Sequence, residues 1–352
     1  MLDKQSQRQD GAGNALQAGN DIHFTVNKGM SYADVHAIAI EVVRANLQEF
    51  KGQAMQIALA RAEAVTEKFL QKLQEEHPKG LQQAQTPDFQ DALFTVQKEY
   101  AKAGDEEFGD LLVDLLVDRT KQADRNLLQL VLNQSLHTAP KLPGAHVATL
   151  SIIFLLRSVR FPNAGTVALL VEEMKKHLRL INENFTTNAS TFAHLEFTGC
   201  GSTVSFEVIS LEQILLKEYP GLFKTVFDSE RLDAEQVDPA IKSSLVMPCL
   251  NDPTKFQLSA VRPDVLDDQL ELLNASAEDG AKMRALYAEA AMNEGQVKEK
   301  ILAAGPFLED IFKAWNSTPI KDFRLTSVGM AIGHANIKRC VGEFSPLDVW
   351  IN

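Results

Sequence analysis

The sequence predicts a mainly α-helical fold with a minor β component, and three observations lead to this prediction. Apolar residues recur at intervals of three and four over most of the chain, which is the period of an amphipathic helix. Between Ser31 and Glu76 there is no proline and a single glycine, Gly52. Segments that alternate polar and apolar residues, as half-buried strands do, are short and few.

Residues 1–30 are predicted to be a polar tail that ends in a short strand or hairpin. Ile22, Phe24 and Val26 alternate with polar residues, which is the pattern of a strand. A two-stranded ribbon alone is only marginally stable in water. These three residues are therefore expected either to pack on their own domain or, in the sharper hypothesis, to mediate self-association with a second copy of the chain.

Residues 31–140 are predicted to form a bundle of long helices. An unbroken first helix over residues 31–76 would be about 65 Å long, with Gly52 as a point where it can bend. A second helix is expected from residue 87 to residue 103. The third, over residues 105–136, carries apolar side chains on more than one face, so it is predicted to be the central buried helix.

Residues 141–352 are predicted to form an α-rich C-terminal domain with short strands. The region 225–254 has few periodic signals and is expected to be a long loop. Helices are expected at 145–158, 165–182, 210–219, 264–273, 278–303, 306–315 and 327–340, and strands at 203–208, 255–260, 322–325 and 347–351.

One segment of the C-terminal domain has winged-helix-like features. Residues 322–331 read as a strand followed by a helix that Thr326 or Ser327 caps, which is common after the wing of such domains. Residues 194–200 can similarly close a recognition-type helix before a turn. Winged-helix domains bind DNA or protein, and the sequence leaves both open.

The composition is that of a globular protein with an acidic balance. The formal net charge is −12, and acidic residues concentrate in roughly the last third of the chain. Such a charge disfavours nucleic acid and anionic membrane surfaces as partners. Three scattered cysteines fit a reducing compartment, no apolar stretch reaches the ~20 residues of a membrane span, and the N-terminus does not resemble a secretory signal. We therefore expect a cytoplasmic protein.

Asp110, Asp114 and Asp118 are the strongest candidates for a chemical site. Their four-residue spacing places them on one face of a helix, where like charges repel unless something neutralises them. A divalent metal ion would neutralise them, which gives a metal-dependent hydrolase as one hypothesis. Arginines such as Arg119 and Arg125 would do the same in a salt-bridged stripe, and no Glu-x-x-His accompanies the aspartates to favour a metal.

No catalytic residue and no cofactor is predicted elsewhere. The histidines are isolated in sequence and form no His-x-x-x-His or His-Glu-x-x-His pattern. Cys200 lies in a glycine-flanked turn six residues after His194, so a cysteine–histidine nucleophile is a minor alternative that requires spatial contact and a lowered thiol pKa. Phosphate-binding glycine loops, nucleophile elbows and kinase signatures do not occur.

Several segments together resemble a family of uncharacterised bacterial proteins that carry only locus-tag names. The C-terminal half is also distantly similar to abortive-infection alpha-type proteins. These resemblances imply a bacterial protein tied to phage defence, and they carry over no catalytic residue. The segments that carry the first resemblance are 13–17, 29–35, 87–90, 112–120, 139–142 and 325–350.

The leading functional hypothesis is a non-enzymatic, self-associating protein that binds a protein partner, with phage defence as its setting. It depends on the long helical seam, the N-terminal strand and the lack of catalytic signatures. A DNA-binding regulator that uses the winged-helix-like region is the first alternative. A metal-dependent hydrolase that uses Asp110, Asp114 and Asp118 is the second.

Overall fold

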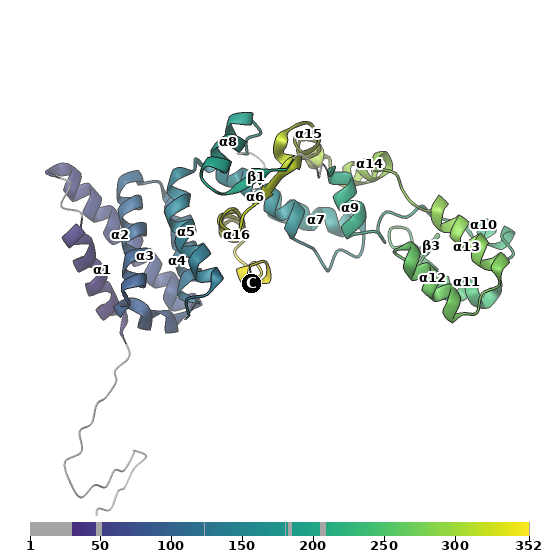
Figure 1. Cartoon of the computed structure of the whole chain (residues 1–352), viewed down its shortest axis with the longest axis horizontal. Helices are drawn as coiled ribbons and strands as arrows, with labels where there is room; N and C mark the ends of the chain where they lie inside the picture. Colours follow the sequence, from purple (N-terminus) through teal and green to yellow (C-terminus); the bar gives the residue numbers. More distant parts are fainter. Residues whose placement is uncertain are drawn as a thin grey trace, which may run out of the picture.

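A computed structural model describes residues 30–46, 51–122, 124–179, 181, 185–204 and 209–351. The predicted strand with Ile22, Phe24 and Val26 lies outside these residues. The described fold is mainly α-helical with two short antiparallel strand pairs, so the predicted fold class is confirmed. Figure 1 shows an elongated arrangement with a helical bundle at one end, a central body and a smaller lobe at the other end.

The predicted long first helix is wrong, because two helices occupy its place. The helix α1 (Tyr32–Asn46) and the helix α2 (Gln53–Glu76) pack against each other, and Val43 of α1 shares a small apolar core with Ala58 and Ala62 of α2. Gly52 precedes α2 with a φ of 61°, a left-handed conformation that glycine adopts without strain. The helical seam therefore folds back on itself instead of extending.

The predicted third helix is likewise two helices. The first of them, α4 (Glu106–Thr120), begins at Asp105, whose carboxylate accepts a hydrogen bond from the Phe108 amide. Eleven of its fifteen residues are buried, which confirms that it is the central helix of the bundle. The rest of the bundle is formed by a 3₁₀ segment η1 (Pro78–Gln85), α3 (Pro87–Ala103), α5 (Leu127–Thr138) and η2 (Ala139–Lys141).

The helix α16 (Ser327–Val341) connects the bundle to the central body. It packs on α6 (Gly144–Ser158) on one side and on α4 and α5 on the other, as Figure 1 shows. The remaining helices of the body are α7 (Val167–Leu178), α8 (Ala189–Phe197), α9 (Leu211–Glu218), α14 (Glu294–Ala304), η3 (Pro306–Leu308), α15 (Glu309–Ser317), η4 (Pro319–Asp322) and η5 (Leu347–Val349).

Strands β1 (Gly201–Thr203) and β4 (Phe323–Leu325) pair antiparallel at the start of α16. Thr326 caps α16 by accepting a hydrogen bond from the Gly329 amide, so the predicted strand and capped helix are confirmed. A wing, however, is a hairpin of consecutive strands, whereas β1 and β4 come from distant parts of the chain and form no wing. The strand predicted at residues 347–351 is also wrong, since residues 347–349 form η5.

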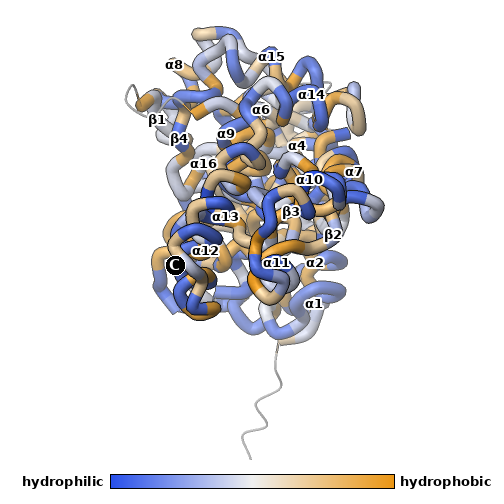
Figure 2. The backbone as a smooth tube through the Cα atoms, turned by 90° about the vertical axis from the view of Figure 1, so that its right-hand side faces the viewer, coloured by the Kyte–Doolittle hydropathy of each residue, from blue (hydrophilic) through white to orange (hydrophobic). Residues whose placement is uncertain are grey.

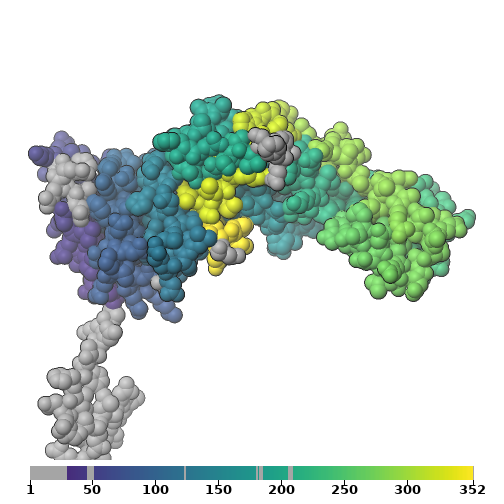
Figure 3. Space-filling model, in the orientation of Figure 1, coloured from purple at the N-terminus to yellow at the C-terminus, as the bar shows by residue number. Residues whose placement is uncertain are grey.

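The lobe is an insertion between α9 and α14 with an apolar core of its own. The prediction of a long loop at residues 225–254 is wrong, because short helices and a strand fill most of it and contribute side chains to this core. Figure 3 shows the lobe projecting from the body. Its elements are α10 (Ser229–Ala234), α11 (Pro239–Leu245), β2 (Val246–Pro248), β3 (Phe256–Leu258), α12 (Pro263–Leu272) and α13 (Ala277–Glu289).

The larger apolar core extends from α1 to the C-terminal segment and crosses residue 140 without interruption. Hydrophobic and hydrophilic stretches alternate along the helices, as helices with one buried face require (Figure 2).

The division into residues 1–30, 31–140 and 141–352 stays a prediction, since it concerns which segments fold independently. Within the described residues, no helix combines the length and the apolarity needed to cross a bilayer.

Candidate functional site

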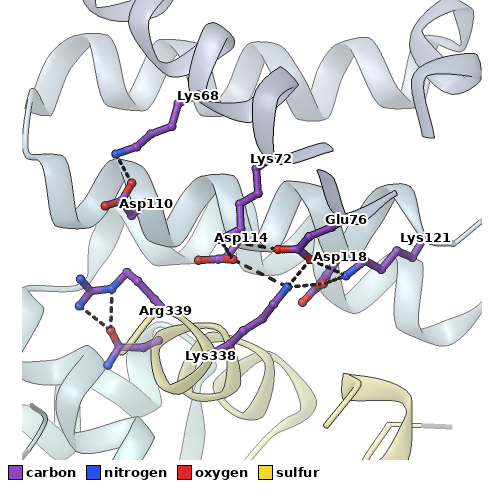
Figure 4. A network of polar contacts seen from close by, with 10 residues as sticks. Lys68, Lys72, Glu76, Asp110, Asp114, Asp118, Lys121, Lys338 and Arg339 are labelled. Carbon is purple, nitrogen blue, oxygen red and sulfur yellow. Dashed lines mark hydrogen bonds and ion pairs between the residues drawn. The ribbon is translucent and has the colours of Figure 1, made fainter. Parts of the chain in front are cut away.

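The predicted stripe of Asp110, Asp114 and Asp118 lies on one face of α4, and that face is turned toward lysines (Figure 4). Asp110 pairs with Lys68 of α2, and Asp114 pairs with Lys72 of α2 at 2.5 Å. The aspartates therefore share a face as the sequence predicts, and a lysine neutralises each of the first two.

The partners of the stripe follow the same spacing as the stripe itself. Lys68, Lys72 and Glu76 recur every four residues along α2, opposite the aspartates that recur every four residues along α4. The first two rungs of this ladder pair an ammonium with a carboxylate. The third rung would bring Glu76 against Asp118, which is a repulsive pair of like charges.

Two further lysines resolve the repulsion at the third rung. Lys121, one residue beyond α4, places its Nζ 3.0 Å from Glu76 and 2.7 Å from Asp118. Lys338 of α16 places its Nζ 2.8 Å from Glu76 and 3.2 Å from Asp118, with Asp114 at 3.8 Å. The third rung thus joins three helices, α2, α4 and α16, through two ammonium groups (Figure 4).

Burial makes this network electrostatically strong. The Asp114 side chain is fully buried, and burial raises its pKa against the opposing effects of Lys72 and Lys338. Burial lowers the pKa of Lys338, but the carboxylates of Asp118, Glu76 and Asp114 outweigh it, so the net shift is upward. Lys338 therefore stays protonated at neutral pH, and its positive charge compensates the carboxylates around it.

The network does not fit a metal site. Glu76, Asp114 and Asp118 converge on one point, but the ammonium of Lys338 occupies that point. Among the described residues, no group of three or more His, Cys, Asp or Glu side chains is arranged to hold a metal ion.

Arg119 lies on another face of α4 and does not neutralise the stripe. Its buried guanidinium pairs with Asp88 and donates hydrogen bonds to Gln83 and Asn133. The cations of the stripe are thus lysines of α2 and α16, together with Lys121, rather than the arginines that the sequence suggested. The matching four-residue spacing of Lys68, Lys72 and Glu76 is the signal that sequence reasoning missed.

A cavity of about 680 Å³ lies beside the third rung. Lys338, Lys121 and His334 contribute to its wall, together with the C-terminal segment that follows α16. His334 is buried, its Nε2 lies 2.8 Å from the Ser345 carbonyl oxygen, and burial lowers its pKa. The imidazole is therefore neutral and donates from Nε2, which holds the C-terminal segment against α16.

Two histidines that are isolated in sequence meet in the structure. Nδ1 of His146 on α6 lies 3.1 Å from Nδ1 of His194 on α8. Burial and the neighbouring His194 lower the pKa of His146. His194 is thus engaged by another histidine, and burial raises the pKa of the Cys200 thiol. Both observations are the opposite of what a cysteine–histidine nucleophile requires.

The fold and the network together define a mainly helical protein whose buried ion pairs fasten its helices. The model of a family of uncharacterised proteins matches residues 29–351, so the chain belongs to this family, as the resemblance predicted. A comparison with curated proteins and a comparison with solved structures find no match. The family match adds nothing on the expected likeness to abortive-infection alpha-type proteins, which stays a prediction.

Proposed function

We propose that this protein is non-enzymatic, self-associates and acts by binding a protein partner. The observation that carries the proposal is that Asp110, Asp114 and Asp118 are all paired with lysines. The carboxylates that would perform chemistry are each held by a lysine, and the ion pairs join α2, α4 and α16. Such an arrangement supports a rigid scaffold, which is what a binding protein needs.

The lobe supports a role in binding, because it presents a surface distinct from the body. Residues 224–292 contain seven Lys and Arg against thirteen Asp and Glu. Leu272 is 80% exposed and Val261 is 40% exposed on this lobe. An acidic surface with exposed apolar side chains is complementary to a partner with a basic surface around an apolar patch.

Self-association is tested by light scattering on the purified chain. At about micromolar concentration we expect a mass above the 38.9 kDa of one chain. Deletion of residues 1–30, which removes Ile22, Phe24 and Val26, is expected to return the protein to a monomer. A full-length chain that is monomeric, with a mass unchanged by the deletion, would refute self-association.

Partner binding is tested by affinity capture from the native cells with two matched variants. Leu272→Arg alters the lobe surface, whereas Leu169→Arg alters a side chain on α7 that is 51% exposed. We expect the amount of captured partner to fall about tenfold or more with Leu272→Arg, because this variant removes an interface anchor. Leu169→Arg should capture the partner as the unmodified chain does. Equal capture by the two variants would show that the lobe surface does not bind the partner.

Phage defence is the setting that we propose for this binding, and the resemblance of the C-terminal half to abortive-infection alpha-type proteins is its support. Plaque counts on cells with and without the gene test this part. Protection is expected to require the gene and to be weakened by Leu272→Arg. Equal plaque counts across a panel of phages would separate the protein from defence while leaving partner binding intact.

The two alternatives have less support. A DNA-binding regulator would have to work although β1 and β4 form no wing beside α16, and against a net charge of −12. A metal-dependent hydrolase would have to displace the Lys338 ammonium from the point where the carboxylates converge. Salt-sensitive DNA binding in a gel-shift assay, or metal in the purified protein that Asp114→Asn removes, would reverse this order.

A further inference from the structure

A cavity of about 670 Å³ opens in the central body, away from the charged network. Its wall is formed by the end of α6, by α9, by β4 and by α16. Its volume lies within the range of roughly 300–1,000 Å³ that small-molecule pockets occupy. The apolar side chains of the wall are Ile153, Ile209, Ile214, Leu325 and Met330.

The wall of this cavity is mostly cationic, whereas the chain as a whole is acidic. Its described wall contains four cationic side chains and one carboxylate, in a protein with a net charge of −12. A low-dielectric wall lined by one sign of charge focuses the field and attracts counter-ions of opposite sign. The charged residues are Arg157, Arg160, Lys217, Glu218 and Arg324.

The single carboxylate of the wall is already engaged. Glu218 pairs with the Nε of Arg160, and Arg160 also donates to the backbone carbonyls of Arg157 and Val159. Arg160 and Glu218 therefore cancel each other locally. Arg157 and Lys217 then supply positive charge to the described wall of the cavity.

Arg157 is held in a fixed orientation. Its guanidinium lies over the ring of Trp315, 5.0 Å from the ring centroid, and one of its amino groups donates to the Lys321 carbonyl oxygen. Its Nε is buried without a hydrogen-bond acceptor, and no carboxylate among the described residues forms an ion pair with it. A planar donor that is oriented in advance loses little entropy when it binds an anion.

We propose that this cavity binds a small organic anion, with a phosphate or carboxylate head near Arg157 and Lys217 and an apolar body on the isoleucines. Arginine matches the oxygen geometry of both head groups, and a lysine adds a point charge. The apolar wall supplies the contact area that an inorganic ion would lack. This site is independent of the lobe and of the Lys338 network, so it goes beyond the proposed function.

Titration calorimetry with three naphthalene probes tests the proposal on the full chain. Naphthyl phosphate and naphthoate carry the two head groups, and naphthol has the same ring without a charge. At least one of the two anions is expected to bind about tenfold or more tightly than naphthol, because the cations act only on the charged head. Which anion binds more tightly identifies the head group, and added salt should weaken the binding.

Substitutions at two lysines locate the site. Lys217→Glu is expected to weaken the anion about tenfold or more, and Lys217→Gln to weaken it less, since the first also introduces repulsion. Lys176→Glu, on the exposed face of α7, makes the same change in net charge away from the cavity and should change affinity less than about twofold. Unchanged circular dichroism and melting temperature verify the fold of each variant.

Three results would each overturn the proposal. The first is no saturable binding of either anion below about 10 mM, an affinity too weak for a specific site. The second is equal affinity for the anions and for naphthol, which would indicate an apolar pocket. The third is an equal loss with Lys176→Glu and Lys217→Glu, which would indicate attraction by net charge alone.

Discussion

At the scale of single residues, the ion pairs of α4 differ in how far they are buried. Lys68 and Asp110 are 49% and 34% exposed, so water screens their attraction. Lys338 and Asp118 are each 12% exposed, and Asp114 is fully buried. Removing one partner of a buried pair leaves a charge without compensation, which costs far more than losing an exposed pair.

Replacing Lys338 by methionine is therefore expected to destabilise the protein by about 3–5 kcal/mol, because the carboxylates of Glu76, Asp114 and Asp118 lose their central cation. Lys68→Met, the matched control at the exposed end of the ladder, should cost no more than about 1 kcal/mol. Urea unfolding followed by circular dichroism measures both. Equal effects of the two variants would contradict a central role for Lys338.

Two histidines, the buried His334 and the partly buried His146, give the stability a defined pH dependence. Burial lowers the pKa of His334, and burial with the neighbouring His194 lowers that of His146, both from an ordinary value of 6.5. Below that value the unfolded chain binds more protons than the folded one, so protonation favours unfolding. The stabilisation is complete above pH 6.5 and is lost as the pH falls from there toward the folded-state values.

Urea unfolding at about pH 7.5 and about pH 5.5, a range in which ordinary histidine titrates, should thus show lower stability at the lower pH. His146→Gln is expected to reduce the difference, because one of the two titrating groups is gone. A stability that is flat or rises as the pH falls over this range would show that the histidines are not held neutral.

At the scale of elements, α16 depends on close contact between backbones. A Cβ on Gly329 would lie 1.9 Å from the Cys200 carbonyl oxygen, and one on Gly333 would lie 3.0 Å from the Leu150 carbonyl oxygen of α6. Asn336, on the same helix, donates to the Ser151 hydroxyl of α6. The absence of two side chains thus lets α16 approach both the β1 turn and α6.

Gly329→Ala is expected to destabilise the protein by about 1–3 kcal/mol, the usual cost of inserting a methyl group into closely packed structure. Here the neighbour is backbone, which cannot rotate away. Gly144→Ala, at the start of α6 with open space around it, is the matched control and should be nearly neutral. Thermal unfolding of both variants checks the difference, and a neutral Gly329→Ala would show that α16 can shift.

At the scale of the whole molecule, the described residues form one large apolar core, a separate core in the lobe and a small core between α1, α2 and α3. The large core joins the bundle and the central body, and the separate core holds the lobe over residues 227–290. The chain enters and leaves the lobe beside a bridge between Lys224 and Ala291, and Asn251 links the lobe to α7 by accepting a hydrogen bond from the Val167 amide. Because few contacts join the lobe to the body, the lobe is expected to unfold locally while the body stays folded.

Leu266→Ala, in the core of the lobe, should therefore destabilise the lobe alone by about 2–5 kcal/mol. Hydrogen exchange read by mass spectrometry is expected to show faster exchange across residues 227–290 and unchanged exchange in α4. Leu116→Ala, in the larger core, should produce the reverse pattern. Faster exchange throughout the chain with either variant would show one cooperative unit instead of two.

The sequence by itself determined the helical class and many of the helices, because helix hydrogen bonds and the amphipathic period are local. It also placed Asp110, Asp114 and Asp118 on one face, since spacing alone fixes that. Tertiary structure decided the point at which the helical seam turns back. It also decided the packing of residues 225–254 into the lobe, because both features depend on distant side chains.

In the charged network, too, local sequence determined one part and tertiary structure determined the other. Lys338 lies 220 positions after Asp118, and no local pattern connects them. Only the packing of α16 against α4 and α5 brings the Lys338 ammonium within ion-pair distance of Glu76 and Asp118. The sequence supplies the charges of the stripe, and the tertiary structure places the Lys338 ammonium at the point where three carboxylates converge.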